Sequence, residues 1–469
     1  LFRSAFCDAL GAKAETVALA FDREGDVERQ LREARPDIVV DASGPFQDYD
    51  DPYRVIRACL ACGVNYLDLA DGSDFVKGVA QFDAQAKACG LFVLSGVSSF
   101  PVLTAAVVRM LAMGMSRVDT VEGGIAPSPY AGVGLNVIRA IASYSGQPIE
   151  LRDGTHHGLA ESRYFTVAPP GRVPLDRIRF SLVDVPDLKV LPELWPSLKS
   201  IWIGAGPVPE ILHRVLNGMA ALVKKRWLPS LSFLAPVMHR AINVLRWGEH
   251  RGGMYIEVAG AGGRGEPVRK SWHMIAEGDD GPFIPSMAVE AIVRRCLDGR
   301  LPPTGARAAT KELEVADYDA LFARRKIWWG VRERMADTAP LYKRLLGDAW
   351  WALPEPVRAL HDFGGDLVAE GRAQVKCGTG VAAQLVATLF GFPKAGDDVP
   401  VTVTFQLRDG REIWRREFAG RVMQSTQEEG AGRFAQLLCE RFGPFAFGLA
   451  LVVEDETLRL VVQIGRAHV

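Results

Sequence analysis

The chain has 469 residues, 48% of them hydrophobic and 24% charged, a composition typical of globular proteins that rules out an intrinsically disordered chain. Its 55 Lys and Arg residues balance 56 Asp and Glu residues, which argues against a protein that coats nucleic acid. At about 150 residues per domain, the length predicts roughly two to four domains. Seven scattered cysteines argue against a disulfide scaffold and indicate a reducing, cytoplasmic compartment.

The N-terminal region alternates strands with helices. Residues 26–34 predict a helix capped by Asp26, and residues 52–62 predict a helix that begins at Pro52 and stops at Gly63. Buried strands and two further helices continue the alternation. The expected strands are 38–40, 65–70 and 91–95, and the further helices are 75–89 and 101–113, the last of them with Ser98 or Ser99 near its cap. Strands that alternate with helices of this length indicate a doubly wound parallel sheet.

A polar turn follows each of these three strands. Residues 41–46 follow the first strand, residues 68–72 the second and residues 95–101 the third. Any one of them would serve as an ordinary turn of a parallel sheet. Because ligands bind beyond the carboxyl ends of parallel strands, the three turns together predict a binding edge. Within the first turn, Gly44 lets the backbone approach a ligand closely and Pro45 stiffens the chain.

A glycine-rich motif further along the chain is not a nucleotide site. Residues 260–265 read Gly-Ala-Gly-Gly-Arg-Gly, which fits the spacing of a dinucleotide fingerprint. Such a fingerprint needs a helix directly after it, whereas here Glu266 and Pro267 lead into alternating apolar and polar residues. The pattern predicts a β-hairpin with a glycine-rich loop.

The middle of the chain predicts a second domain without a clear catalytic signature. Residues 118–125 predict a strand and residues 133–144 a helix. His156 and His157 follow a hairpin turn, where one could serve as a general acid, although such a pair is more often a surface or interface feature. Tyr130 is an alternative proton donor. No catalytic residue is assigned, and no metal site is predicted, because the Cys-x-x-Cys pair at 59–62 lacks a second pair and is interpreted as core thiols.

Residues 209–247 combine basic, aromatic and apolar side chains. They contain six Lys or Arg residues against the single acid Glu210, together with Trp227, Phe233 and Trp247. A hairpin of this kind can lie in a membrane interface, and the alternative is a pair of helices packed on the second domain or on a dimer partner. No membrane-spanning helix is predicted, because no segment has about 20 uninterrupted apolar residues.

The C-terminal region changes pattern from Pro340 onward. Short helices are expected at 341–346 and 379–390, followed by alternating strands, with a turn at Asp409-Gly410. The basic, aromatic segment 324–332 before it is interpreted as a packed helix or linker face rather than a base-stacking surface. The region predicts a separate α+β domain, with binding or assembly as its default role.

Several segments resemble the saccharopine-dehydrogenase-like oxidoreductases. These are residues 37–47, 57–72, 94–108, 278–299 and 301–325. The C-terminal region resembles the uncharacterised domain DUF4166, which is often fused behind such proteins. The resemblance implies a Rossmann domain that binds NADP or NAD, a mostly antiparallel second domain, and a return helix that packs back on the first domain. Lysine-pathway saccharopine chemistry is a weaker option, because the Arg and Lys clamps for several carboxylates are not evident.

The resemblance also implies which residues hold the nucleotide. Gly44, Pro45 and Phe46 would line the adenine or ribose side, with Asp71 and Gly96 nearer the nicotinamide. The family's first strand, its glycine-rich loop and the residue that selects NAD or NADP would all precede Leu1. The chain is therefore interpreted as a fragment, truncated at both ends, that would bind dinucleotide poorly.

The predicted fold class is α/β: a Rossmann-type doubly wound parallel sheet without its first strand and glycine-rich loop, a mostly antiparallel α+β second domain, and a separate C-terminal α+β domain. The predicted domains are a partial NAD(P)-binding domain at 1–117, a substrate or dimerisation domain at 118–284, a return helix and linker at 285–335, the C-terminal domain at 340–463, and a non-native tail at 464–469.

Two functions remain open at this point. The first is hydride transfer to or from a carbonyl, imine or enoyl group of a small or lipid-like substrate, because the sequence shows no other catalytic motif and the chemistry would come from the cofactor. The second is a non-catalytic protein that binds lipid or a membrane periphery through residues 209–247 on a Rossmann scaffold. A homo-dimer is expected, and nucleic acid is not an expected partner.

Overall fold

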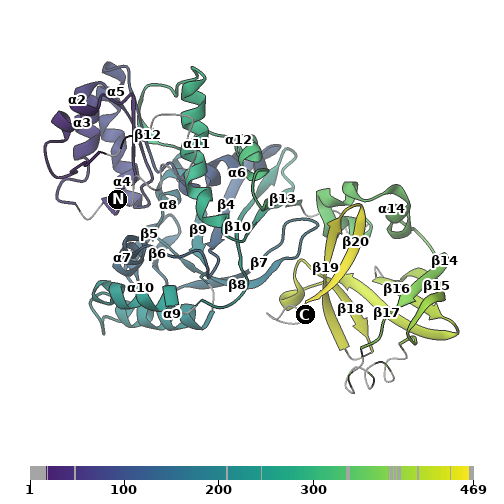
Figure 1. The fold of residues 1–469 in the computed structure, drawn as a ribbon. Coiled ribbons are helices and arrows are strands. Elements are labelled where there is room, and N and C mark those ends of the chain that lie inside the picture. Colours follow the sequence, from purple (N-terminus) through teal and green to yellow (C-terminus); the bar gives the residue numbers. More distant parts are fainter. Residues whose placement is uncertain are drawn as a thin grey trace. The chain divides into compact units, whose positions relative to one another are not determined.

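The computed structural model describes residues 17, 19–46, 49–207, 210–244, 246–333, 339–378, 380, 384, 387, 392–408, 411–443 and 445–463. The described chain forms two compact units, whose helices and strands are labelled in Figure 1. The first unit comprises the residues up to Ala105 with 185–193 and 284–314, and the second comprises 106–184, 194–283 and the residues from Val315 onward. The predicted tail at 464–469, the turn at 409–410 and most of the helix at 379–390 lie outside the described residues.

A four-stranded sheet in the order β1-β2-β3-β12 forms the centre of the first unit. All of its neighbouring strands run parallel. Its strands are β1 (Ile38–Asp41), β2 (Asn65–Asp68), β3 (Phe92–Ser95) and β12 (Gly305–Ala308). The helical segments that belong wholly to this unit are α2 (Val27–Ala34), α3 (Arg54–Cys62), α4 (Ser73–Gly78), η2 (Val79–Phe82), α5 (Asp83–Ala88), η3 (Ser99–Leu103) and α11 (Ile284–Leu297). The parallel sheet of the predicted fold class is confirmed, and α11 with β12 returns to it from far along the chain.

The helix ends of this unit follow the local sequence signals. The Asp26 carboxylate accepts a hydrogen bond from the Arg29 backbone N–H at 3.0 Å and caps α2, as predicted. Gly63 ends α3 with a φ of 74°, a left-handed conformation that suits glycine. The single helix expected at 75–89 is instead divided into α4, η2 and α5. Ser98 is the N-cap residue of η3, as expected, and its side chain makes no capping hydrogen bond.

The core of the first unit lies between the sheet and its helices. Ile56, Tyr66, Phe75 and Val93 are buried in it together with Cys59. Burial raises the pKa of the Cys59 thiol to about 12, so this side chain behaves as a small apolar core residue at neutral pH. The interpretation of the Cys-x-x-Cys pair as core thiols therefore holds for Cys59.

The second unit contains a seven-stranded sheet in the order β13-β11-β10-β4-β9-β8-β7. Its neighbouring strands are antiparallel except for β4 and β9, so it is mostly antiparallel, as predicted. The strands are β4 (Met115–Ala126), β7 (Ser162–Val167), β8 (Leu175–Leu182), β9 (Ser200–Ala205), β10 (Arg251–Gly262), β11 (Pro267–Glu277) and β13 (Ile327–Glu333), with a separate hairpin of β5 (Pro148–Leu151) and β6 (Gly154–His157). The helices are α7 (Leu135–Tyr144), α9 (Glu210–Lys224), α10 (Ala235–Val244) and α12 (Val315–Phe322).

Two segments of this sheet test specific sequence interpretations. The glycine-rich motif joins β10 to β11, with Gly260 opposite Val268, so the predicted hairpin is confirmed and the nucleotide fingerprint is excluded. The basic, aromatic segment at 324–332, expected as a helix or linker, instead contributes β13. Trp328 and Trp329 of β13 pair with Ile275 and Met274 of β11, because the backbone of this apolar run bonds to the open edge of the sheet.

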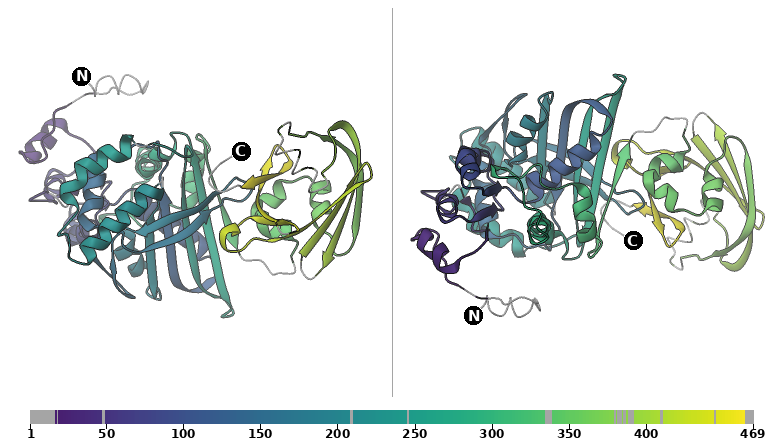
Figure 2. Two further views of the ribbon diagram at one scale, coloured as in Figure 1. Left: turned by 90° about the horizontal axis from the view of Figure 1, so that it is seen from below. Right: turned by 90° about the horizontal axis from the view of Figure 1, so that it is seen from above.

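The C-terminal region forms its own seven-stranded antiparallel sheet, in the order β14 to β20. In Figure 2 its yellow-green strands curve around short green helices. The strands are β14 (Leu367–Val375), β15 (Gly396–Arg408), β16 (Arg411–Phe418), β17 (Arg421–Glu429), β18 (Leu438–Phe442), β19 (Phe445–Glu454) and β20 (Thr457–Gln463), and the helices are α13 (Leu341–Leu346) and α14 (Glu355–His361). Leu341 and Leu345 of α13 pack on Phe405, Trp414 and other inward-facing residues of the sheet. The predicted α+β domain is confirmed.

Candidate functional site

The carboxyl ends of β2 and β3 are joined through Asp68. Its Oδ1 atom accepts hydrogen bonds from the Ser95 hydroxyl at 2.9 Å, the Gly96 N–H at 2.8 Å and the Ala70 N–H at 3.0 Å. Its Oδ2 atom is buried and makes no hydrogen bond within the part of the chain that the structure describes. Burial raises the pKa of Asp68 to about 7, against the opposing effect of the three donors. Asp68 therefore holds two polar turns of the expected binding edge together.

The turn after β1 is held by a buried ion pair between Arg23 and Asp41. The guanidinium of Arg23 contacts the Asp41 carboxylate and donates to the Ser43 hydroxyl at 2.9 Å and the Pro52 carbonyl at 2.8 Å. The Tyr66 hydroxyl also donates to Asp41, at 3.2 Å. Sequence reasoning missed Arg23, because it stands in a short polar stretch without periodicity and its partner is 18 residues away.

The predicted nucleotide-binding residues all belong to these turns, but they differ in exposure. Asp71 is exposed, Gly44 and Pro45 are half-buried, and Gly96 is buried with a φ of 71°. Phe46 is only 1% exposed, and its ring stacks on Phe75 with centroids 4.9 Å apart, so this side chain belongs to the core of the first unit. The nucleotide-binding role of the five residues stays a prediction.

A second buried acid of the first unit escaped sequence reasoning. Asp187, the first residue of α8 (Asp187–Leu194), is fully buried, and burial raises its pKa to about 7. Two ion pairs, Lys189 with Asp74 and Lys77 with Glu193, join α8 to α4, which begins directly after the polar turn of β2. No local pattern in the sequence marks Asp187, because its burial depends on this long-range packing.

The histidines and the tyrosine considered as acids lie in the second unit. His156 is held between Glu161 and Asp153 at 2.8 and 3.1 Å, and the hydrogen bond that its ring donates to the Glu161 carboxylate is the main cause of its raised pKa. Burial, followed by the charge of Lys224, lowers the pKa of His157. Tyr130 packs against His250 with ring centroids 4.7 Å apart. The contacts of His156 hold the turn of the β5–β6 hairpin and explain its position without a catalytic role.

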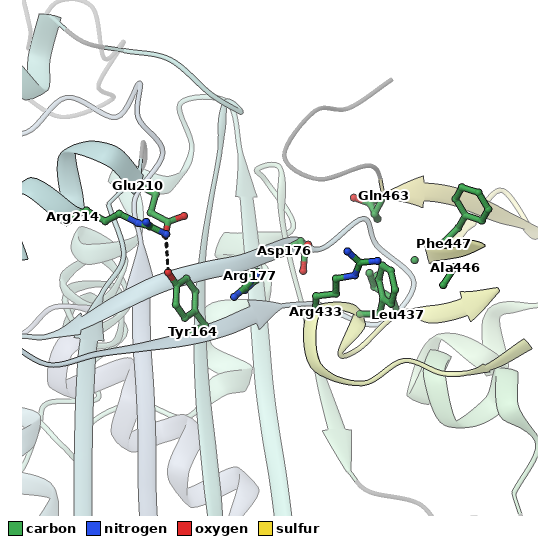
Figure 3. A pocket seen from close by; sticks show the side chains of 12 residues that line it. Tyr164, Asp176, Arg177, Glu210, Arg214, Arg433, Leu437, Ala446, Phe447 and Gln463 are labelled. Atoms are coloured by element: carbon green, nitrogen blue, oxygen red, sulfur yellow. Dashed lines mark hydrogen bonds and ion pairs between the residues drawn. The ribbon is translucent and has the colours of Figure 1, made fainter. Parts of the chain in front are cut away.

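The second unit also contains a cleft of about 480 Å³ (Figure 3). In the close view, the Arg214 side chain reaches the Tyr164 hydroxyl, at 3.3 Å, and Glu210 lies beside both. Tyr164 donates to Glu210 at 2.8 Å, and Arg214 forms an ion pair with the same carboxylate at 2.9 Å. The polar groups of Tyr164, Glu210 and Arg214 thus bond to one another.

The polar edge of the first unit suits a ligand rich in hydrogen-bonding groups. Besides the Asp68 carboxyl, the hydroxyls of Ser73 and Ser99 are buried there without a hydrogen-bond partner in the described structure. Among the described residues, no group of three or more His, Cys, Asp or Glu side chains could hold a metal ion.

Comparison with known families identifies the C-terminal domain. Residues 353–467 match the model of a domain of unknown function, DUF4166. This match confirms the resemblance predicted for the C-terminal region. No curated protein matches the chain.

Three solved structures to which the chain is similar at low identity are dehydrogenases. Saccharopine dehydrogenase (L-Glu forming) from Saccharomyces cerevisiae is 10% identical, with a TM-score of 0.48 over 71% of this chain and 92% of that one. The WlbA dehydrogenase from Thermus thermophilus, solved with NAD and α-ketoglutarate, is 14% identical, with a TM-score of 0.26 over 67% and 82%. The MviM dehydrogenase from Clostridium difficile is 9% identical, with a TM-score of 0.27 over 64% and 80%.

Proposed function

We propose that the protein is an NAD(P)-dependent oxidoreductase that transfers a hydride to or from a carbonyl, imine or enoyl group. The observation that carries this proposal is the polar edge of the parallel sheet, where Asp68 joins the turns after β2 and β3. Ligands of doubly wound folds bind at this edge, and the resemblance of the surrounding segments to saccharopine-dehydrogenase-like oxidoreductases favours a nicotinamide nucleotide. The proposal covers both NADP and NAD.

The residues of the edge act by positioning. The Arg23–Asp41 pair fixes the turn that contains Gly44 and Pro45, and Asp68 fixes the backbone at Gly96. Both turns thus present backbone groups at a set place, which reduces the entropy lost when a ligand binds. A bound nicotinamide nucleotide supplies or accepts the hydride, and the protein orients it and excludes water.

The test is a fluorescence titration of the full-length protein with NADPH and with NADH. We expect saturable binding of at least one nucleotide, and its loss in the Gly96→Ala variant, where a new Cβ would lie 2.9 Å from Pro101. Gly90→Ala is the matched control, because Gly90 has a similar φ of 69° but open space around its Cα. If the folded protein binds neither nucleotide, the proposal is wrong and the first unit serves only as a structural scaffold.

A non-catalytic lipid-binding protein is the second candidate. It is favoured by the exposed aromatic residues of the α9–α10 region, where Trp227 is 73% and Phe233 is 65% exposed. The two candidates differ in their response to NADPH. If the protein binds lipid vesicles but does not oxidise NADPH in the presence of carbonyl, imine and enoyl substrates, the result supports the second candidate, in which the first unit is only a scaffold.

A further inference from the structure

The helices α9 and α10 present large apolar side chains to solvent. Trp227 and Phe233 lie in the connection between the helices, and Val237 and Val244 continue along α10. Val237 and Val244 are seven residues apart, so they share one face of α10. Large apolar side chains exposed at several positions of one short segment indicate an interaction site.

The same segment is strongly basic. Between residues 210 and 247 there are six Lys or Arg residues and one acid, and all six basic side chains are exposed. The acid, Glu210, pairs with Arg214. The five others are Lys224, Lys225, Arg226, Arg240 and Arg246. The next acid along the chain, Glu249, forms an ion pair with Arg251. The surface therefore carries a net positive charge around its aromatic side chains.

An apolar pocket of about 150 Å³ lies among α9, α10 and the segment 127–133. Most of its wall is apolar, and Val215 lines it while being 56% exposed, so the pocket reaches the solvent-facing side of α9. Its volume is about that of apolar cavities that hold one benzene molecule. The wall residues include Val133, Leu212, Leu216, Met219, Met238 and Ile242.

We propose that the α9–α10 surface docks on an anionic lipid bilayer and that the pocket takes the end of an acyl chain. Two features together hold amphipathic helices in a membrane interface. Their aromatic side chains lie at the level of the lipid head groups, and basic residues surround these side chains. Among the described residues, no helix has the length and apolarity to cross a bilayer.

The charge favours a bilayer over a second copy of the chain. In a two-fold symmetric dimer through this surface, each basic patch would face the same basic patch of the other copy. Such an arrangement repels, whereas anionic head groups attract every basic side chain of the patch.

The test is flotation of the full-length protein, without nucleotide, on vesicles of phosphatidylcholine mixed with phosphatidylglycerol. We expect the protein to float with these vesicles, to remain behind with pure phosphatidylcholine, and to be released by high salt. The Trp227→Ala/Phe233→Ala variant and the Lys224→Gln/Lys225→Gln/Arg226→Gln variant should each bind about 10-fold more weakly or worse. Because nucleotide is absent, failure here leaves the oxidoreductase proposal untouched.

Trp351→Ala is the matched control, because Trp351 is a 63% exposed tryptophan that also lies beside basic side chains, those of Lys343 and Arg358. It should bind vesicles like the wild type. The proposal is overturned if the wild-type protein fails to float with the anionic vesicles, or if Trp351→Ala weakens binding as much as the double variant does.

Binding of an acyl chain in the pocket is measured separately, by the fluorescence of bound cis-parinaric acid. The Ala241→Phe substitution adds a ring to the pocket wall and should abolish probe binding while flotation persists. A folded Ala241→Phe protein that binds the probe like the wild type would remove the pocket from the proposal. Circular dichroism establishes that each variant is folded.

Discussion

The Ser95 hydroxyl donates a hydrogen bond to the Asp68 carboxylate at 2.9 Å, and this contact joins the carboxyl ends of two neighbouring parallel strands. The carboxylate is fully buried, yet one of its oxygens makes no hydrogen bond in the described structure. An acid in this position stabilises the turns best when it is protonated, because only then is no charge buried.

Asp68 should make the first unit less stable as the pH rises. Its pKa is about 7 in the folded protein against 3.8 ordinarily, so its stabilising effect is complete below about pH 4 and is lost as the pH rises through 7. The effect is at most about 4 kcal/mol. Asp68→Asn, which stays neutral, should flatten this dependence, and hydrogen exchange of β2 and β3 at about pH 5 and about pH 8 measures it. Asp187 contributes in the same direction, so a slope will remain. If the stability of the first unit falls with pH as steeply in Asp68→Asn as in the wild type, the raised pKa does not belong to Asp68.

Arg23→Met should destabilise the first unit by about 3–5 kcal/mol, because it leaves the Asp41 charge buried without its partner. Arg29→Met is the control, since Arg29 and Glu33 form an exposed pair at 3.6 Å and its loss should cost less than about 1 kcal/mol. Hydrogen exchange of α2 and β1 compares the two variants. Equal exchange protection in the two variants would show that the buried Arg23–Asp41 pair stabilises the first unit no more than the exposed pair does.

Gly96→Ala should destabilise the first unit more than Gly90→Ala does. Both glycines have a positive φ near 70°, so each substitution costs about 1 kcal/mol in the backbone. At Gly96 the new Cβ also meets Pro101 at 2.9 Å and Val76 at 3.2 Å, whereas at Gly90 it meets nothing within 4 Å. Chemical unfolding followed by hydrogen exchange of β3 should rank the two variants in this order, and the reverse order would refute the packing argument.

Glu440→Ala should loosen the C-terminal sheet by about 3 kcal/mol. One oxygen of Glu440 accepts hydrogen bonds from Arg416 at 2.9 Å, Ser425 at 2.6 Å and Gln427 at 3.0 Å, so its loss removes an acceptor shared by three largely buried donors. Glu417→Ala, at an exposed pair with Arg415 on the same sheet, should change little. Exchange protection of β16 to β18 reports both effects, and a similar loss in the two variants would show that the buried network adds nothing.

The local elements were predictable wherever neighbouring residues decide them. Asp26 caps α2 through a bond to Arg29, three positions along, and Gly63 ends α3 by its own conformational freedom. The glycine-rich hairpin was predictable for the same reason, because Pro267 and the alternation after it exclude a helix. By contrast, β12 pairs with β3 from far along the chain, and nothing in either segment alone specifies that pairing.

The sequence by itself determined the alternation of strands and helices, the order of the three polar turns, and the basic and aromatic character of residues 209–247. Only the tertiary structure decided that Asp41 is paired with Arg23, that the Phe46 ring belongs to the core, and that Asp68 is buried with a raised pKa. The reason is physical. Helix periodicity and caps depend on residues a few positions apart, whereas burial and hydrogen-bond partners depend on segments that meet only when the chain folds.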